Sequence, residues 1–95
     1  MNAEEKVIRN SNFIFRKIVD EMVLIPYKQD VADLNAIFTL NDLGAFIWEK
    51  LEQPSTRAEL EQVIYTEYDV DLSTIKQDLE VFLDEMAEIG AISKV

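Results

Sequence analysis

The stretch LNDLGAFIWEKL, residues 40 to 51, decides the fold of this chain. Its apolar residues recur at the three- and four-residue spacing of an amphipathic helix: Leu43, Phe46, Ile47 and Leu51. Asn41 stands directly before them, where its side-chain oxygen can cap the first turn. Gly44 costs a helix about 1 kcal/mol relative to alanine, so we expect it where this helix closely approaches the sheet or another helix. The stretch therefore predicts a helix that begins after Asn41 and packs Trp48 into the core.

The residues before this helix favour β-structure. The run NFIFRKIVDEMVLIPY, residues 12 to 27, contains two stretches rich in β-branched and aromatic residues, and residues 19 to 21 between them suit a hairpin turn. The run LNAIFTL, residues 34 to 40, favours a third strand. Residues 1 to 10 are polar and charged, and we expect them to form a loose start.

Two further helices follow the first. The capping-box pattern TRAE, residues 56 to 59, opens the second helix. The third has the clearest helical period, set by Leu72, Ile75, Leu79, Phe82, Met86 and Ile89. Asp71 or Ser73 can cap its start, and Gly90 ends it. Strands first and helices afterwards predict a single α+β domain over residues 1–95, winged-helix-like, with a three-stranded antiparallel sheet followed by three helices.

The composition excludes several kinds of chemistry. The 95 residues include 19 acids and 9 bases, and the net charge of −10 repels nucleic-acid phosphates and anionic membrane surfaces. The chain has no cysteine and no histidine, which removes disulfides, thiol and imidazole catalysis and the usual soft-metal ligands. No apolar run has the length of a signal core or a membrane span. We expect a cytoplasmic chain with no cofactor, no metal, no nucleic-acid partner and no membrane partner.

The other candidate sites have plain structural interpretations. Carboxylates crowd the last helix, as expected for a solvated face: Asp78, Glu80, Asp84, Glu85 and Glu88. Both glycines stand alone, so there is no glycine-rich phosphate loop, and no serine has a histidine partner. A DNA-binding helix would need bases, but the last helix offers Lys76 among acids. The sequence predicts a chain that is not an enzyme.

Four segments in order resemble the PqqD-like proteins. LNDLGAFIWEKL resembles their Leu-Asn-x-x-Gly/Ala-x-x-Ile-Trp signature, and STRAELEQVIYTEYDVD resembles their Thr-x-x-Glu-Leu helix ending in Tyr-Asp-Val. IKQDLEVFLDEMAEIGAI is similar to their final helix, and VIRNSNFIFRKIVDEMVLIP to their opening hairpin. These proteins are the peptide chaperones of pyrroloquinoline quinone (PQQ) biosynthesis and the wider class of precursor-peptide recognition elements. The family often has Thr or Ser where this chain has Leu43, so the resemblance implies the general role and leaves the pathway open.

The resemblance implies a binding function. Such domains bind the leader segment of a ribosomally synthesised precursor peptide and present it to a modifying enzyme, often a radical S-adenosylmethionine (SAM) enzyme. An exposed strand edge can hold an extended peptide through backbone hydrogen bonds. The same open edge permits a homodimer. Since this chain has no cysteine, an iron–sulfur cluster would belong to the enzyme partner.

By resemblance, the third strand and the last helix form the two walls of the peptide groove. The candidate peptide-binding residues are Ala36, Ile37, Phe38, Thr39 and Leu40 on the strand and Lys76, Asp78, Val81, Phe82 and Glu85 on the helix. Asp78 and Glu85 would attract Lys or Arg of the leader, and Val81 would meet an apolar anchor. Core packing is the alternative role for Phe38 and Phe82.

Other functions are compatible with the same pattern. A winged-helix adaptor for another protein, or a small subunit that stabilises an enzyme, would have the same composition and element order. A DNA-binding regulator is the third alternative, disfavoured by the acidic last helix.

Overall fold

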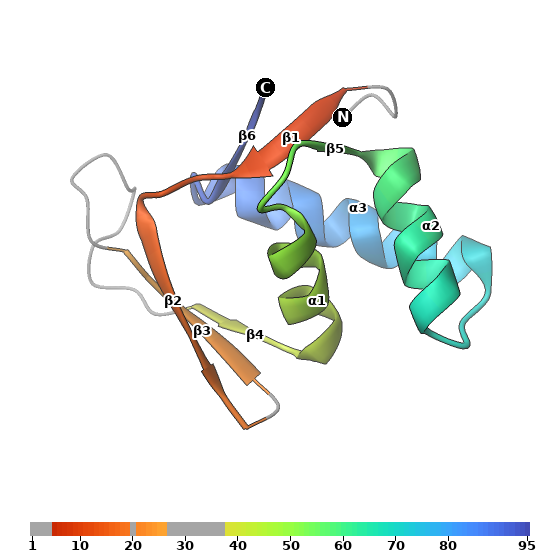
Figure 1. Ribbon diagram of the computed structural model, residues 1–95, viewed down its shortest axis with the longest axis horizontal. Coiled ribbons are helices and arrows are strands. Elements are labelled where there is room, and N and C mark those ends of the chain that lie inside the picture. Colours follow the sequence, from red (N-terminus) through yellow and green to blue (C-terminus); the bar gives the residue numbers. More distant parts are fainter. Residues whose placement is uncertain (1–4, 20, 27–37) are drawn as a thin grey trace.

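The computed structural model describes residues 5–19, 21–26 and 38–95. The elements follow in the order β1 (Lys6–Arg9), β2 (Phe13–Ile18), β3 (Glu21–Pro26), β4 (Phe38–Leu40), α1 (Asp42–Lys50), β5 (Ser55–Thr56), α2 (Arg57–Glu67), α3 (Leu72–Glu88) and β6 (Ile92–Lys94). Figure 1 shows α1 between the sheet of β2, β3 and β4 and the helix α2, with β1, β5 and β6 above it. The α+β fold with three helices is confirmed.

The first sheet is the one that the sequence predicts. Its strand order is β2-β3-β4, and both pairs are antiparallel. Ile18 pairs with Glu21 at the closed end of the β2–β3 hairpin. Val19, in the turn, has a φ of 53°, the left-handed conformation that tight hairpin turns require.

A second sheet corrects the expectation of a loose start. β1 lies between β5 and β6, and Val7 pairs with Ser55 on one side and Lys94 on the other. The side chain of Val7 is buried. The expectation was wrong for residues 6 to 9 because the partners of this strand, residues 55–56 and 92–94, lie far from it in the sequence, and the local pattern of polar residues does not reveal them. Residues 1 to 4 lie outside the described residues.

The helices begin and end where their capping residues predict. The side-chain oxygen of Asn41 accepts a hydrogen bond of 2.8 Å from the backbone N–H of Gly44. Thr56 and Glu59 form the complete capping box of α2. Asp71, not Ser73, caps α3, and Gly90 follows its end with a φ of 79°. These local contacts fix the start of α1 directly after β4.

Trp48 lies in the core, as predicted, with none of its surface exposed. The ring of Phe15 meets its indole edge-on at a centroid distance of 5.9 Å, and the guanidinium of Arg9 lies near both rings. The buried side of α3 contributes Ile75, Leu79, Leu83 and Met86 to the same core. Within the described residues, no helix is long and apolar enough to cross a membrane.

Candidate functional site

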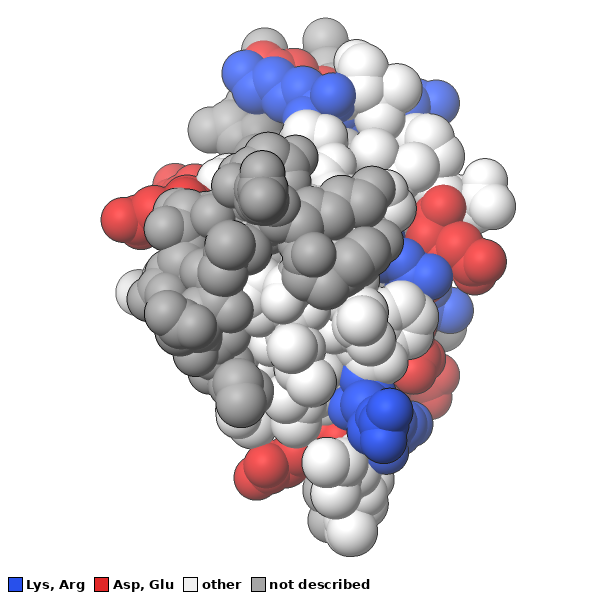
Figure 2. Space-filling model, turned by 90° about the vertical axis from the view of Figure 1, so that its left-hand side faces the viewer, with Lys and Arg blue, Asp and Glu red and all other residues white. Residues whose placement is uncertain are grey.

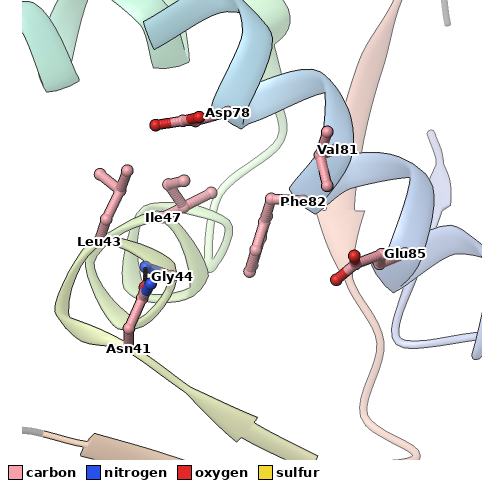
Figure 3. A pocket seen from close by; sticks show the side chains of 8 residues that line it. All are labelled: Asn41, Leu43, Gly44, Ile47, Asp78, Val81, Phe82 and Glu85. Carbon is pink, nitrogen blue, oxygen red and sulfur yellow. Dashed lines mark hydrogen bonds between the residues drawn. The ribbon is translucent and has the colours of Figure 1, made fainter. Parts of the chain in front are cut away.

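A pocket of about 290 Å³ lies between the start of α1 and the middle of α3. Its lining residues are Asn41, Leu43, Gly44 and Ile47 from the α1 side and Asp78, Val81, Phe82 and Glu85 from α3. Figure 3 shows the ring of Phe82 pointing from α3 into the space between the two helices, with Asp78 and Glu85 on either side of it. The pocket is therefore apolar in the middle and acidic at both ends.

Helical spacing explains why these four residues of α3 share one side. Val81, Phe82 and Glu85 follow Asp78 by three, four and seven positions. Residues at these spacings lie on the same face of an α-helix. The adjacent face holds the core residues of α3. Phe82 lies at the boundary, half-buried and packed against the core, whereas Val81 is 53% exposed. The side of α3 that faces the pocket therefore has apolar surface, from Val81 and Phe82, that core packing does not cover.

Gly44 is the point where β4, α1 and α3 meet. A Cβ atom on Gly44 would lie 3.2 Å from Cε1 of Phe82 and 3.3 Å from Cβ of Leu40. The close approach that this glycine predicts is confirmed, and its partners are the last residue of β4 and a side chain of α3. The end of β4 consequently lies beside the pocket.

Among the described residues, the backbone groups of Thr39 on the outer edge of β4 have no strand partner. Ile18 and Glu21 close a two-residue hairpin turn, so this pair exchanges backbone hydrogen bonds. Hydrogen-bonded and non-hydrogen-bonded pairs alternate along the strands, so the N–H and C=O of Val23, two residues later, also point towards β2. Thr39 pairs with Val23, so its N–H and C=O point away from β3. In the part of the chain that the structure describes, no strand lies beyond β4.

The candidate strand residues alternate between the two faces of the sheet. Leu40 is buried, Phe38 is half-buried and Thr39 is exposed. The ring of Phe38 packs edge-on against Phe13 at a centroid distance of 6.0 Å, so core packing accounts for much of its surface. Ala36 and Ile37 lie outside the described residues.

The pocket unites four of the five candidate residues on α3, and the fifth lies elsewhere. Lys76 is two positions from Asp78, which turns it about 200° around the helix. It is exposed and does not line the pocket, and its backbone carbonyl accepts a hydrogen bond of 3.2 Å from Arg57. Its proposed contact with a peptide stays a prediction from sequence.

The residues on the side of the pocket formed by α1 were not among those predicted from sequence. The two predicted walls of the groove are the third strand and the last helix. The structure adds Asn41, Leu43, Gly44 and Ile47, which line the pocket from the α1 side. A signal was present, since Leu43, Gly44 and Ile47 share one helical face and the glycine predicts a close approach. The sequence did not say whether that approach was to the sheet or to α3.

The two carboxylates of the pocket are free to pair with a ligand. Within the described residues, neither Asp78 nor Glu85 has a hydrogen-bond or salt-bridge partner, whereas Glu80 on another face of α3 pairs with Arg57 at 3.5 Å. In the same part of the chain no group of three or more acids could hold a metal ion. The described arrangement suits the binding of an apolar group that carries positive charge.

Residues 21–92 match the model of the family described as coenzyme PQQ synthesis protein D (PqqD). The chain belongs to the PqqD family. The matched range contains every residue of the pocket, from Asn41 to Glu85, together with β3 and β4. The predicted family resemblance is confirmed.

A solved structure described as TbiB1 in complex with the TbiA(beta) leader peptide is similar to this PqqD-family chain. The two share 28% sequence identity with a TM-score of 0.73, over 90% of this chain and 94% of that chain. No curated protein matches this chain.

Proposed function

We propose that this PqqD-family protein binds the leader segment of a ribosomally synthesised precursor peptide as a strand added to the free edge of β4, beside α3. The observation that carries the proposal is the pocket between α1 and α3, which adjoins the edge of β4 that no other described strand occupies. A similar chain that is bound to a leader peptide supports it.

Strand addition divides affinity and selectivity between two parts of the site. The outward N–H and C=O of Thr39 pair with the peptide backbone, which every sequence offers. Phe38 and Leu40 hold the strand in place from the core side. Selectivity comes from Asp78, Val81, Phe82 and Glu85, whose side chains meet alternate residues of the peptide.

The edge is held in place before any peptide arrives. The Asn41 cap fixes the turn between β4 and α1, and the packing of Gly44 against Leu40 and Phe82 fixes the end of β4 relative to α3. A binding surface that is already ordered loses less conformational entropy when the ligand docks.

The protein in this proposal is a non-catalytic, cytoplasmic chaperone. It presents the bound leader to a separate peptide-modifying enzyme, for which a radical SAM enzyme is the proposed class. The family and the free edge support the peptide partner, and the absence of histidine and cysteine supports the assignment of the chemistry to the partner.

Substitution of Val81 by Asp tests the proposal. The probe is a fluorescein-labelled dodecapeptide that is selected on the wild-type protein from a random display library. We expect Val81→Asp to weaken binding at least tenfold in fluorescence anisotropy, because a carboxylate would replace an apolar contact in the pocket. Circular dichroism should be unchanged, since Val81 is 53% exposed.

Val70→Asp is the matched control, because Val70 is an exposed valine outside the pocket. Amide exchange of the wild-type complex locates the peptide. Protection should appear at Thr39. A selected peptide that protects only β1 and β6, or that binds Val81→Asp as tightly as wild type, would overturn the assignment.

A further inference from the structure

We infer that the groove selects a leader segment in which one apolar residue is flanked, two positions away on each side, by Lys or Arg. This pattern, basic-x-apolar-x-basic, rests on the proposed function and names the class of peptide that the site takes. It follows from two distances: the separation of Asp78 and Glu85 along α3, and the spacing of same-side residues in a peptide bound as a β-strand.

The middle of the groove accepts an apolar side chain. Leu43 and Ile47 face it from α1, and Val81 and Phe82 face it from α3. The glycine at position 44 leaves room for the Phe82 ring at the base of the pocket. The volume of about 290 Å³ is large enough for one such side chain. We place the central residue of the peptide here.

The ends of the groove accept positive charge. Asp78 and Glu85 are seven residues apart, which corresponds to about 10.5 Å along a helix axis. Figure 3 shows them on opposite sides of Phe82 along α3. Neither is neutralised by a cation within the described residues.

The geometry of a strand converts that distance into a sequence spacing. Residues at positions −2, 0 and +2 of an added strand point to the same side, and the outer two are about 13 Å apart. The strand spacing exceeds the separation of the two carboxylates by about 2.5 Å. Lys and Arg side chains at −2 and +2 are long and flexible enough to lean inwards by this amount. Residues at −1 and +1 point to the opposite side, so a base there faces away from the carboxylates.

The direction of β4 relative to α3 supports the pairing of two peptide bases with Asp78 and Glu85. β4 and α3 slope the same way in both Figure 1 and Figure 3, so a strand added along β4 follows α3. The other charged groups of α3 lie off the pocket: Lys76, Glu80, Asp84 and Glu88. Asp78 and Glu85 are therefore the charges that set the spacing.

Two synthetic peptides of equal composition test the inference. GTKTLTKTG places both lysines two positions from leucine, and GTTKLKTTG places them next to it. We expect the first to bind about tenfold more tightly at low salt, because each exposed ion pair contributes up to about fivefold. Titrations followed by 1H–15N NMR of the full chain measure both affinities and show where each peptide binds.

A reversal of charge supplies the decisive control. The double variant Asp78→Lys and Glu85→Lys should prefer GTETLTETG over GTKTLTKTG. The variant Asp84→Lys and Glu88→Lys changes the net charge by the same amount outside the pocket, and it should keep the wild-type preference.

The outcomes separate the two proposals. Equal affinity for both lysine peptides, with shifts at β4 and α3, would overturn the spacing and leave the leader-binding function standing. The same holds if both double variants reverse their preference together, since net charge would then explain it. Shifts confined to other elements, or no shifts with any peptide, would overturn the leader-binding function as well.

Discussion

Gly44 shows how one residue controls both packing and the shape of the site. A side chain there would press on the ring of Phe82 and on Leu40, which are the neighbours that define the base of the pocket. The cost of a glycine in a helix, about 1 kcal/mol relative to alanine, is thus offset by a close contact between three elements.

We expect Gly44→Val to lower the free energy of unfolding by about 1–3 kcal/mol, as overpacking in a well-packed region does. Phe82 must move to relieve the contact, so the variant should also bind the selected dodecapeptide more weakly. Urea unfolding and anisotropy measure the two effects. Ala58→Val on the exposed side of α2 is the control, and a similar loss there would show that helix propensity alone is responsible.

Tyr68 predicts a pH dependence at the alkaline end. Burial raises the pKa of Tyr68 to about 12, and the bond of 3.0 Å that its hydroxyl donates to Asp42 acts in the same direction. A phenol with a raised pKa stabilises the folded chain in its protonated form. That contribution is fully present below pH 10, the ordinary value, and is lost as the pH rises to about 12.

The expected result is a decline in stability between pH 10 and pH 12 that Tyr68→Phe removes. Urea midpoints across this range measure stability, and the absorbance of tyrosinate at alkaline pH reports the ionisation itself. Tyr65→Phe serves as control, because Tyr65 is 53% exposed. A decline of the same size in Tyr68→Phe would contradict the assignment.

At the scale of single elements, the β2–β3 hairpin contains local strain. Val19 is the only described residue other than glycine with a positive φ, at 53°, and its side chain is 87% exposed. A left-handed conformation costs a residue with a Cβ roughly 1–2 kcal/mol, whereas asparagine tolerates it better. The turn is therefore a place where the sequence and the backbone conformation disagree.

We expect Val19→Asn to raise the free energy of unfolding by about 1 kcal/mol. Chemical denaturation provides the measurement. Val70→Asn tests whether the loss of an exposed valine is sufficient, because Val70 is exposed but has no positive φ. An unchanged or lowered stability in Val19→Asn would show that the turn is not strained.

The elements differ in how far the sequence could predict them. Helix starts depend on neighbours three residues away, so the sequence alone indicates Asn41 and Thr56 as capping residues and leaves Asp71 or Ser73 for α3, of which the structure shows Asp71. β1 depends on β5 and β6, whose residues 55–56 and 92–94 lie far from β1 in the sequence. The charged residues Lys6 and Arg9 of β1 therefore resemble loop residues in the sequence, and the local pattern does not predict the second sheet.

The candidate site was predictable on one helix and not on the other. Spacing along α3 is enough to place Asp78, Val81, Phe82 and Glu85 on one face, and the pocket unites them. The contribution of Leu43 and Ile47 depends on how α1 approaches α3. That angle is set by packing across the core and leaves no separate pattern in the sequence.

At the scale of the whole molecule, charge is unevenly distributed. Residues 57–95 contain ten acids and three bases, whereas the described residues between 5 and 26 contain two acids and four bases. Figure 2 shows the side of the molecule that carries β2, where uncharged side chains gather among basic and acidic ones. Residues 57–95, which include α2 and α3, carry a net charge of −7, most of the −10 of the whole chain.

This distribution predicts a salt-dependent association rate. A peptide with two lysines should associate with the protein more slowly as sodium chloride rises from about 20 to about 500 mM, because screening shortens the reach of the acidic field. Stopped-flow fluorescence measures the rate. An analogue with glutamine in place of lysine should respond little, and equal responses of both peptides would rule out electrostatic steering.

The pairing of β1 with β6 brings the two ends of the described chain together. The backbone N–H of Val95 donates to the carbonyl of Lys6 at 3.0 Å, and Figure 1 shows these strands far from the junction of β4 and α1. Neighbouring strands are only about 4.8 Å apart, so two short connectors would be enough to graft the fold into a surface loop of a host protein. Because the groove lies at the opposite end of the fold from β1 and β6, it would then face solvent and remain accessible to peptides.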